Sequence, residues 1–186
     1  MPFAHAVLAA GIPPRDVIGL VPCAQGATPL ANWTRGTELY DRMVTRTKAA
    51  LADCGDLAGM LWFQGETDAM KREDAELYQS RMEALVRDVR RDLNKPDLPR
   101  HRGQSKQFLT SNSVLIVTAQ YGGKYLDRVR EAQKAVSRSL PNVKYVDAKG
   151  LQIASDYTHL TTQAQVQLGR HASKVLPGRT IVFVSN

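Results

Sequence analysis

Residues 57–93 read LAGMLWFQGETDAMKREDAELYQSRMEALVRDVRRDL, and this stretch decides the fold class. Its first part, Leu57 to Phe63, is apolar throughout, which is typical of a strand buried on both faces. Its last part places apolar residues at helical spacing over a charged outer face, at Leu77, Tyr78, Met82, Leu85, Val86, Val89 and Leu93. A buried strand followed by an amphipathic helix is the repeating unit of a parallel α/β sheet.

The same unit recurs along the chain. Apolar strands are predicted at residues 17–21, 114–119 and 143–147, and helical patterns follow them at 37–55, 124–139 and 162–176. A short helix is expected at 2–11 and a last strand at 181–184. Because parallel strands need crossover helices, we predict an α/β fold with a three-layer, doubly wound parallel sheet, in a single domain over residues 1–186.

Composition suits a globular protein and argues against disorder. The chain has 186 residues, 43% of them hydrophobic, with 25 basic and 18 acidic side chains and a net charge of +7. No apolar run approaches the ~20 residues of a membrane span, and the first residues lack the charged start and cleavage site of a secretory signal. We therefore expect neither a membrane anchor nor a leader, and a cytoplasmic location by default.

Cysteines and histidines give no sign of a metal centre. Cys23 and Cys54 have no CxxC spacing, so the sequence favours two reduced thiols over a disulfide. The four histidines are scattered and form no cluster with zinc-ligand spacing. We expect no metal and no other cofactor.

Polar residues follow three of the predicted strands, at the edge where α/β sheets bind ligands. In the last of these loops, Asp156 precedes His159 by three residues, so its carboxylate can hold the imidazole in one tautomer and leave the other nitrogen as a general base. In the second loop, Gln64 can donate to an oxyanion and Glu66 can orient a base. A surface histidine, and ordinary turn and capping chemistry, remain the alternatives.

Five blocks together resemble a known family. They are GLVPCAQGAT (19–28), WFQGETD (62–68), VREAQ (129–133), VDAKG (146–150) and DYTHLTTQAQ (156–165). In this order they resemble the plant-type carbohydrate esterases of the sialate O-acetylesterase (SASA) family, a branch of the SGNH hydrolases, over about residues 3–176. The resemblance implies a five-stranded parallel sheet and hydrolysis of acetyl esters on sugars by a serine nucleophile without a metal.

The resemblance also assigns site residues. His159 matches the catalytic histidine of the family, and Asp156 matches the aspartate three residues before it. Glu66 matches a glutamate that in some relatives is thought to orient the histidine instead. Gly26 and Gln64 match the oxyanion-hole positions. Ala27 departs from the pattern, since the family usually has a second glycine there.

The nucleophile is the larger departure. The family carries its serine in a Gly-Gln-Ser-Asn block at the end of its first strand, and these 186 residues contain no such block. The sequence resembles a domain that is incomplete at its N-terminus, and we predict an inactive or impaired esterase. In the family's strand order, 2-1-3-4-5, the missing strand would leave a gap between the first two strands of this chain.

One segment imitates the missing block. Gly103-Gln104-Ser105-Lys106 lies in a basic connection that precedes a strand, whereas a nucleophile should follow one. Residues from about 100 to 113 look like an insertion relative to the family. We therefore predict that Ser105 is not the nucleophile and that it lies far from His159.

Two other functions remain open from sequence alone. The domain can be a non-catalytic sugar-binding or interaction remnant that keeps the wall of the site. The basic cluster around residues 87–106 also suggests nucleic-acid binding, but acidic residues interrupt it and no stacking aromatics lie within it. An acetylated carbohydrate is the expected partner, with neither nucleic acid nor a membrane, and the oligomeric state is open.

Overall fold

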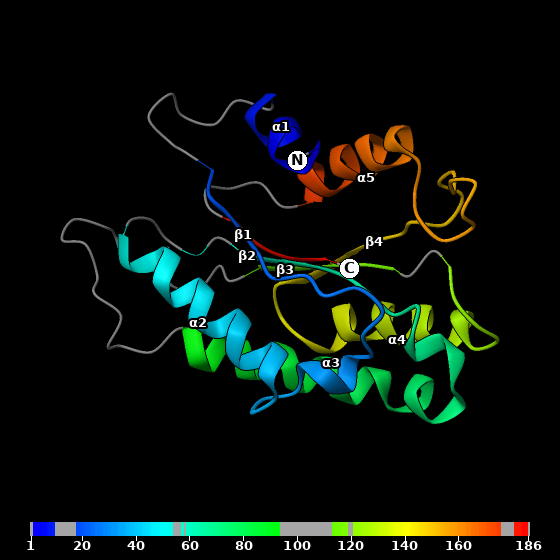
Figure 1. Cartoon of the computed structure of the whole chain (residues 1–186), viewed down its shortest axis with the longest axis horizontal. Coiled ribbons are helices and arrows are strands. Elements are labelled where there is room, and N and C mark those ends of the chain that lie inside the picture. The colour runs from blue at the N-terminus through cyan, green and yellow to red at the C-terminus, as the bar shows by residue number, and fades with distance from the viewer. Residues whose placement is uncertain are drawn as a thin grey trace.

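The computed structural model describes residues 2–9, 18–53, 57, 59–93, 113–118, 121–175 and 181–185. These residues form a parallel sheet with helices on both faces (Figure 1). The strands are β1 (Leu20–Pro22), β2 (Gly59–Phe63), β3 (Ser113–Val117), β4 (Val143–Val146) and β5 (Ile181–Ser185). The helices are α1 (Pro2–Ala9), α2 (Glu38–Asp53), α3 (Arg72–Leu93), α4 (Leu126–Ser139) and α5 (Thr162–Val175), with short 3-10 helices η1 (Leu30–Trp33) and η2 (Asp68–Met70).

The predicted α/β order and three-layer architecture are confirmed. Every pair of neighbouring strands in the sheet is parallel. The helical pattern of α3 is also confirmed, with one exception: Leu77 is 46% exposed, and Ala75 takes the buried position on that turn instead. The helix therefore turns its buried face slightly away from the one that the sequence predicted.

Side chains that alternate in direction along the strands form two hydrophobic cores, one on each face of the sheet. Trp62 and Ile116 pack with α2, α3 and α4 on one face of the sheet. Leu61 and Leu115 pack with α1 and α5 on the other. Successive residues of a strand point to opposite faces, so strands that are apolar along their whole length supply both cores. Figure 1 shows the same division, with α1 and α5 above the sheet and α2, α3 and α4 below it.

The sheet order β1-β5-β2-β3-β4 overturns the expected gap. The C-terminal strand β5 lies between β1 and β2 and pairs with both, with Val182 in register with Val21 on one side and Met60 on the other. The predicted last strand therefore does form, and it is the second of the five strands in the sheet order. Because β5 supplies backbone partners on both sides, neither neighbour faces an unpaired ladder there.

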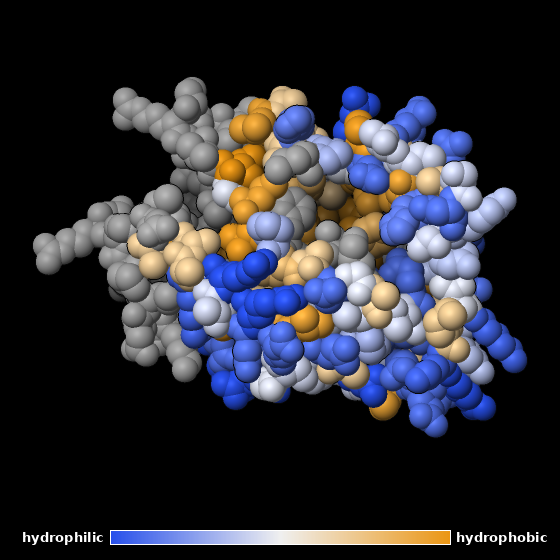
Figure 2. Space-filling view, viewed as in Figure 1, coloured by the Kyte–Doolittle hydropathy of each residue, from blue (hydrophilic) through white to orange (hydrophobic). Residues whose placement is uncertain are grey.

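The surface agrees with this layering. Figure 2 shows apolar residues gathered over the middle of the viewed face, between the two helix layers, where the edge strand β1 runs. The outer surface of the lower helix layer is largely hydrophilic, as expected for solvated helix faces (Figure 2). Among the described helices, none is both long and apolar enough to cross a bilayer.

Two sequence predictions fall outside the described residues. Ser105 and the predicted insertion, up to residue 112, lie in the range 94–112, and Cys54 also lies outside the described residues; Ser113, the last residue of the predicted insertion, is the first residue of β3. Cys23 is described as a buried free thiol, only 2% exposed.

Candidate active site

The carboxyl ends of the parallel strands bring the predicted site loops to one edge of the sheet. The loops after β1, β2 and β4 all leave the sheet at this edge, at the right of Figure 1. Hydrogen bonds join neighbouring loops: Gln64 Nε2 donates to the carbonyl of Thr28 at 3.0 Å, and Thr118 Oγ1 donates to Asp147 at 2.9 Å. This edge is therefore a cross-linked platform rather than a set of separate turns.

His159 and Asp156 form the most chemically suggestive pair on this platform. The distance from His159 Nδ1 to Asp156 Oδ2 is 2.8 Å. Because an ionised carboxylate can only accept, the proton in this bond belongs to Nδ1, which leaves Nε2 unprotonated in the neutral ring. The imidazole is 76% exposed, and no other group in the described part of the chain bonds to it. Nε2 is thus presented to solvent as a base.

The Asp156 carboxylate is held as the charged form. The backbone N–H groups of His159 and Thr158 both donate to its Oδ1 at 2.9 Å, and its Oδ2 faces the imidazole. These bonds, led by the one from the His159 backbone, lower the pKa of Asp156 to about 2. The carboxylate therefore stays ionised at neutral pH and can stabilise a positive charge on the imidazole.

Gln64 lies at the end of β2, buried to 2% exposure. Its Nε2 donates to Thr28 O at 3.0 Å and to Asp68 Oδ2 at 2.5 Å, while its Oε1 accepts from the Tyr78 hydroxyl at 3.0 Å. Both side-chain N–H donors thus have protein acceptors, and the amide ties the first loop to the second. An oxyanion role for this side chain stays a prediction, and it requires that one of these bonds be exchanged for the ligand.

Asp68 is a buried hydrogen-bond partner of Gln64 that sequence reasoning did not single out. It is fully buried, and both of its carboxylate oxygens accept from the Leu30 backbone N–H, at 3.1 and 3.0 Å. Burial raises the pKa of Asp68, against the lowering effect of the bonds from Gln64 and Leu30. The sequence signal was its place in the WFQGETD block, four residues after Gln64, but no local pattern indicated a partner 38 residues away.

Tyr78 and Gln133 complete this buried polar network, and neither was predicted. The Gln133 side chain, from α4, donates to the backbone carbonyl of Gln64 at 2.6 Å and to the Tyr78 hydroxyl at 3.0 Å. Trp62 Nε1 donates to the same hydroxyl at 3.3 Å. Burial, together with the nearby charge of Asp68, raises the pKa of Tyr78, so the hydroxyl keeps its proton. The network fixes the end of β2 against α3 and α4.

Glu66, the other predicted carboxylate, lies in the turn between β2 and η2 and is partly buried. Its charge contributes to the raised pKa of Tyr78. In this structure the carboxylate on His159 Nδ1 is that of Asp156. A role for Glu66 in orienting the base stays a prediction.

Gly26 and Ala27 form an exposed turn after β1. A Cβ added at Gly26 would meet no atom within 4 Å, so open space surrounds this residue. Ala27 has a φ of 58°, in the left-handed region that favours glycine. The family's usual second glycine is therefore replaced by a residue that must adopt the glycine conformation under strain.

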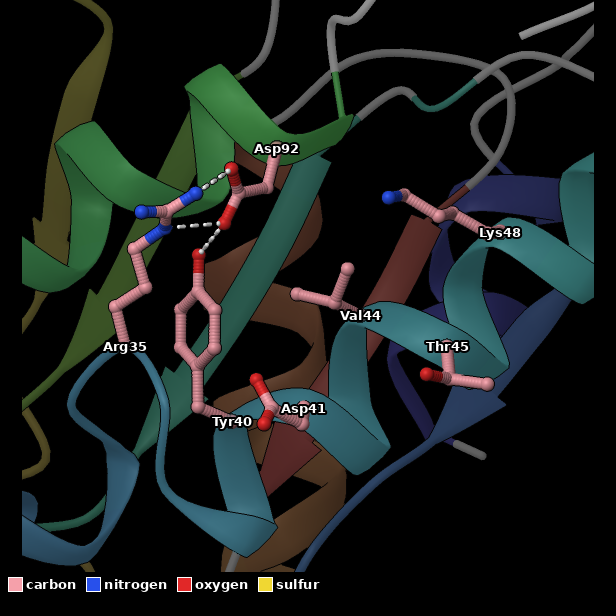
Figure 3. Close-up of a pocket in the computed structure, with 7 residues that line it drawn as sticks. All are labelled: Arg35, Tyr40, Asp41, Val44, Thr45, Lys48 and Asp92. Carbon is pink, nitrogen blue, oxygen red and sulfur yellow. Dashed lines mark hydrogen bonds and ion pairs between the residues drawn. The ribbon is translucent and has the colours of Figure 1, made fainter.

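A cavity of about 230 Å³ lies elsewhere, against the last turn of α3. Figure 3 shows residues that line it, among them Asp92, on which the Arg35 guanidinium and the Tyr40 hydroxyl converge. The distances from Asp92 to Arg35 are 2.9 and 3.0 Å, and the distance to Tyr40 is 2.7 Å. This cluster clamps the start of α2 to the end of α3, far along α3 from the loop that carries Gln64. Within the described residues no group of three or more His, Cys, Asp or Glu could hold a metal ion.

Comparison with known proteins identifies relatives. Residues 1–176 match the family described as "Carbohydrate esterase, sialic acid-specific acetylesterase". An Arabidopsis thaliana protein named "Probable carbohydrate esterase At4g34215" is 45% identical over 169 residues, which cover 91% of this chain and 59% of that protein. The crystal structure of the Arabidopsis protein superposes with a TM-score of 0.82 at 42% identity, and the match covers 94% of this chain and 66% of that one. The chain thus spans less than two thirds of the length of this relative.

Proposed function

The chain belongs to the sialic acid-specific acetylesterase family of carbohydrate esterases, and from this premise we propose that its domain serves the hydrolysis of acetyl esters on carbohydrates. His159 is the general base in this proposal, and Asp156 is the carboxylate that orients it. The substrate is a sugar that carries an O-acetyl group.

The observation that carries the proposal is the 2.8 Å contact between His159 Nδ1 and Asp156 Oδ2 at the carboxyl edge of the sheet. An imidazole whose Nδ1 is held by an ionised carboxylate has its Nε2 available to take a proton from a hydroxyl nucleophile. The exposure of the ring lets a large, polar substrate such as a sugar reach it.

The proposed chemistry is that of a serine esterase in which His159 is the base. A serine hydroxyl attacks the acetyl carbonyl while His159 Nε2 takes the hydroxyl proton, and Asp156 stabilises the resulting imidazolium. The imidazolium then gives the proton to the departing sugar oxygen, which leaves an acetyl-enzyme. Water, deprotonated by the same nitrogen, releases acetate and restores the hydroxyl. Backbone N–H groups near Gly26 would stabilise the oxyanion at each stage.

The nucleophile is the part of this scheme that the sequence does not supply, because its 186 residues contain no Gly-Gln-Ser-Asn block. We therefore propose that the 186-residue chain alone has no appreciable esterase activity. Loss of one member of a catalytic triad lowers kcat by roughly 10⁴ to 10⁶ in related chemistries.

Acetate release from methyl 2,3,4-tri-O-acetyl-β-D-xylopyranoside tests the proposal. The protein to assay carries an upstream strand that ends in Gly-Gln-Ser-Asn, with residues 181–186 removed so that β5 does not compete for the same position in the sheet. We expect acetate release by this protein and none by the 186-residue chain.

Variants of this protein test which residue is the base and which carboxylate orients it. His159→Ala should abolish release, and Asp156→Asn should lower it far more than Glu66→Gln if Asp156 orients the base. Turnover that survives His159→Ala would refute the proposed function. Robust turnover by the 186-residue chain that disappears with Ser105→Ala would show instead that this segment holds the nucleophile.

A further inference from the structure

Tyr157 stands at the tip of the loop that presents His159, in a conformation that few tyrosines adopt. Its φ is 58°, in the left-handed region. Its side chain is 76% exposed, the highest value among the exposed large hydrophobic residues of the described chain. Folding alone explains neither feature, because glycine or asparagine fits this backbone with less strain and an exposed ring contributes nothing to the core.

Backbone hydrogen bonds connect the two sides of the loop around Tyr157. Ile153 and Leu160 form an antiparallel bridge, and the Ala154 N–H donates to the His159 carbonyl at 2.7 Å. The Tyr157 N–H donates to the Ala154 carbonyl at 3.0 Å, and Asp156 accepts from the two residues after the tyrosine. These bonds therefore hold the Tyr157 backbone in place, and the aromatic ring does not have to pack against the core to fix its position.

The position of Tyr157 relates it to the proposed base. It precedes His159 by two residues, so the two Cα atoms are at most about 7 Å apart. The Tyr157 side chain is therefore close enough to reach a pyranose ring whose acetyl group lies at His159. Two further exposed side chains lie after strands that end at the same edge: Met70 ends η2, which follows β2, and Tyr121 lies in the loop that follows β3.

We propose that Tyr157 is a substrate-recognition residue, an aromatic platform on which the pyranose ring of the acetylated sugar stacks. The negative face of an aromatic ring attracts the polarised C–H bonds on the flat face of a pyranose. A tyrosine on a fixed backbone has few torsions to lose on binding, so stacking costs little entropy. The strain at φ 58° is then retained because it holds the ring at the rim of the site. This inference rests on the proposed function.

Ligand binding by the 186-residue chain tests the platform without any need for turnover. The probe is methyl 2,3,4-tri-O-acetyl-β-D-xylopyranoside, and the dissociation constant is measured by saturation-transfer NMR. Tyr157→Asn removes the ring and suits the left-handed backbone, so it should weaken binding about five- to tenfold without lowering Tm. Tyr157→Phe keeps the ring and should bind within about twofold of wild type.

The matched control is Tyr145→Thr, which removes another exposed tyrosine, on β4, and should leave binding unchanged. Binding by Tyr157→Asn equal to wild type would overturn the platform while leaving the proposed function intact. Loss of binding in Tyr157→Phe would also overturn it, because the hydroxyl and not the ring would be responsible. If the wild-type chain binds no acetylated sugar at all, the proposed function fails, and this inference fails with it.

Discussion

Replacing Val182 by proline probes the most consequential feature of the fold, the central position of β5. Val182 pairs in register with Val21 and with Met60, so its backbone lies inside two ladders. Proline has no N–H, and within a sheet it is tolerated essentially only at edges and bulges. The ladder loses one hydrogen bond and leaves a buried carbonyl without its donor, which together cost about 2–4 kcal/mol.

Urea unfolding followed by tryptophan fluorescence measures this cost. Trp33 and Trp62 are 1% and 0% exposed and pack edge to face at 5.4 Å, so their emission reports on the core. The expected loss corresponds to a midpoint lower by about 1–2 M urea. Val182→Thr is the control because it keeps the N–H and the β-branched shape. If Val182→Pro unfolds at the same urea concentration as Val182→Thr, β5 is not a central strand and the reasoning is refuted.

Two further substitutions test the polar clusters. Arg35 and Tyr40 lower the pKa of Asp92 to about 2, so its charge stabilises the fold above pH 4 and this contribution is lost between about pH 4 and 2. Since Arg35 is half-exposed, Asp92→Asn should lower the free energy of unfolding in urea by about 1–2 kcal/mol at pH 7. This difference from wild type should vanish near pH 2. A difference that persists at pH 2 would refute the ion-pair explanation. Asp68→Ala leaves the Leu30 N–H and a Gln64 N–H without acceptors in a buried place, so it should cost about 2–5 kcal/mol, and a cost under about 0.5 kcal/mol would show that other acceptors replace the carboxylate.

The sequence predicted the layers because they depend on local periodicity. The apolar run before Gln64 and the helical spacing up to Leu93 were sufficient for β2 and α3. The place of β5 was not predictable in this way. Residues 181–184 carry a clear strand signal, but strand order depends on contacts between distant segments, and here the last strand pairs with the first.

In the site, too, local contacts were predictable from the sequence and contacts between distant segments were not. The pairing of Asp156 with His159 was predictable, because three residues in a tight loop bring the two side chains together. The buried network was not, because Gln133 reaches Gln64 across 69 residues, and Asp68 reaches Leu30 across 38. Such contacts follow from the packing of α3 and α4 on the sheet, and no short motif encodes them.

The central claim is that His159, at the carboxyl edge of the sheet, can act as the general base for a serine nucleophile placed at that edge. β5 runs parallel to β2 and ends in register with Phe63, just before Gln64. Extending the chain with Gly-Gln-Ser-Asn in place of Asn186 should therefore put a serine at the carboxyl edge. Acetate release from the triacetyl xyloside is the decisive measurement. We predict release that disappears with His159→Ala and with a Gly-Gln-Ala-Asn tail. A folded extended protein that releases no acetate, or one whose release survives His159→Ala, would contradict the claim.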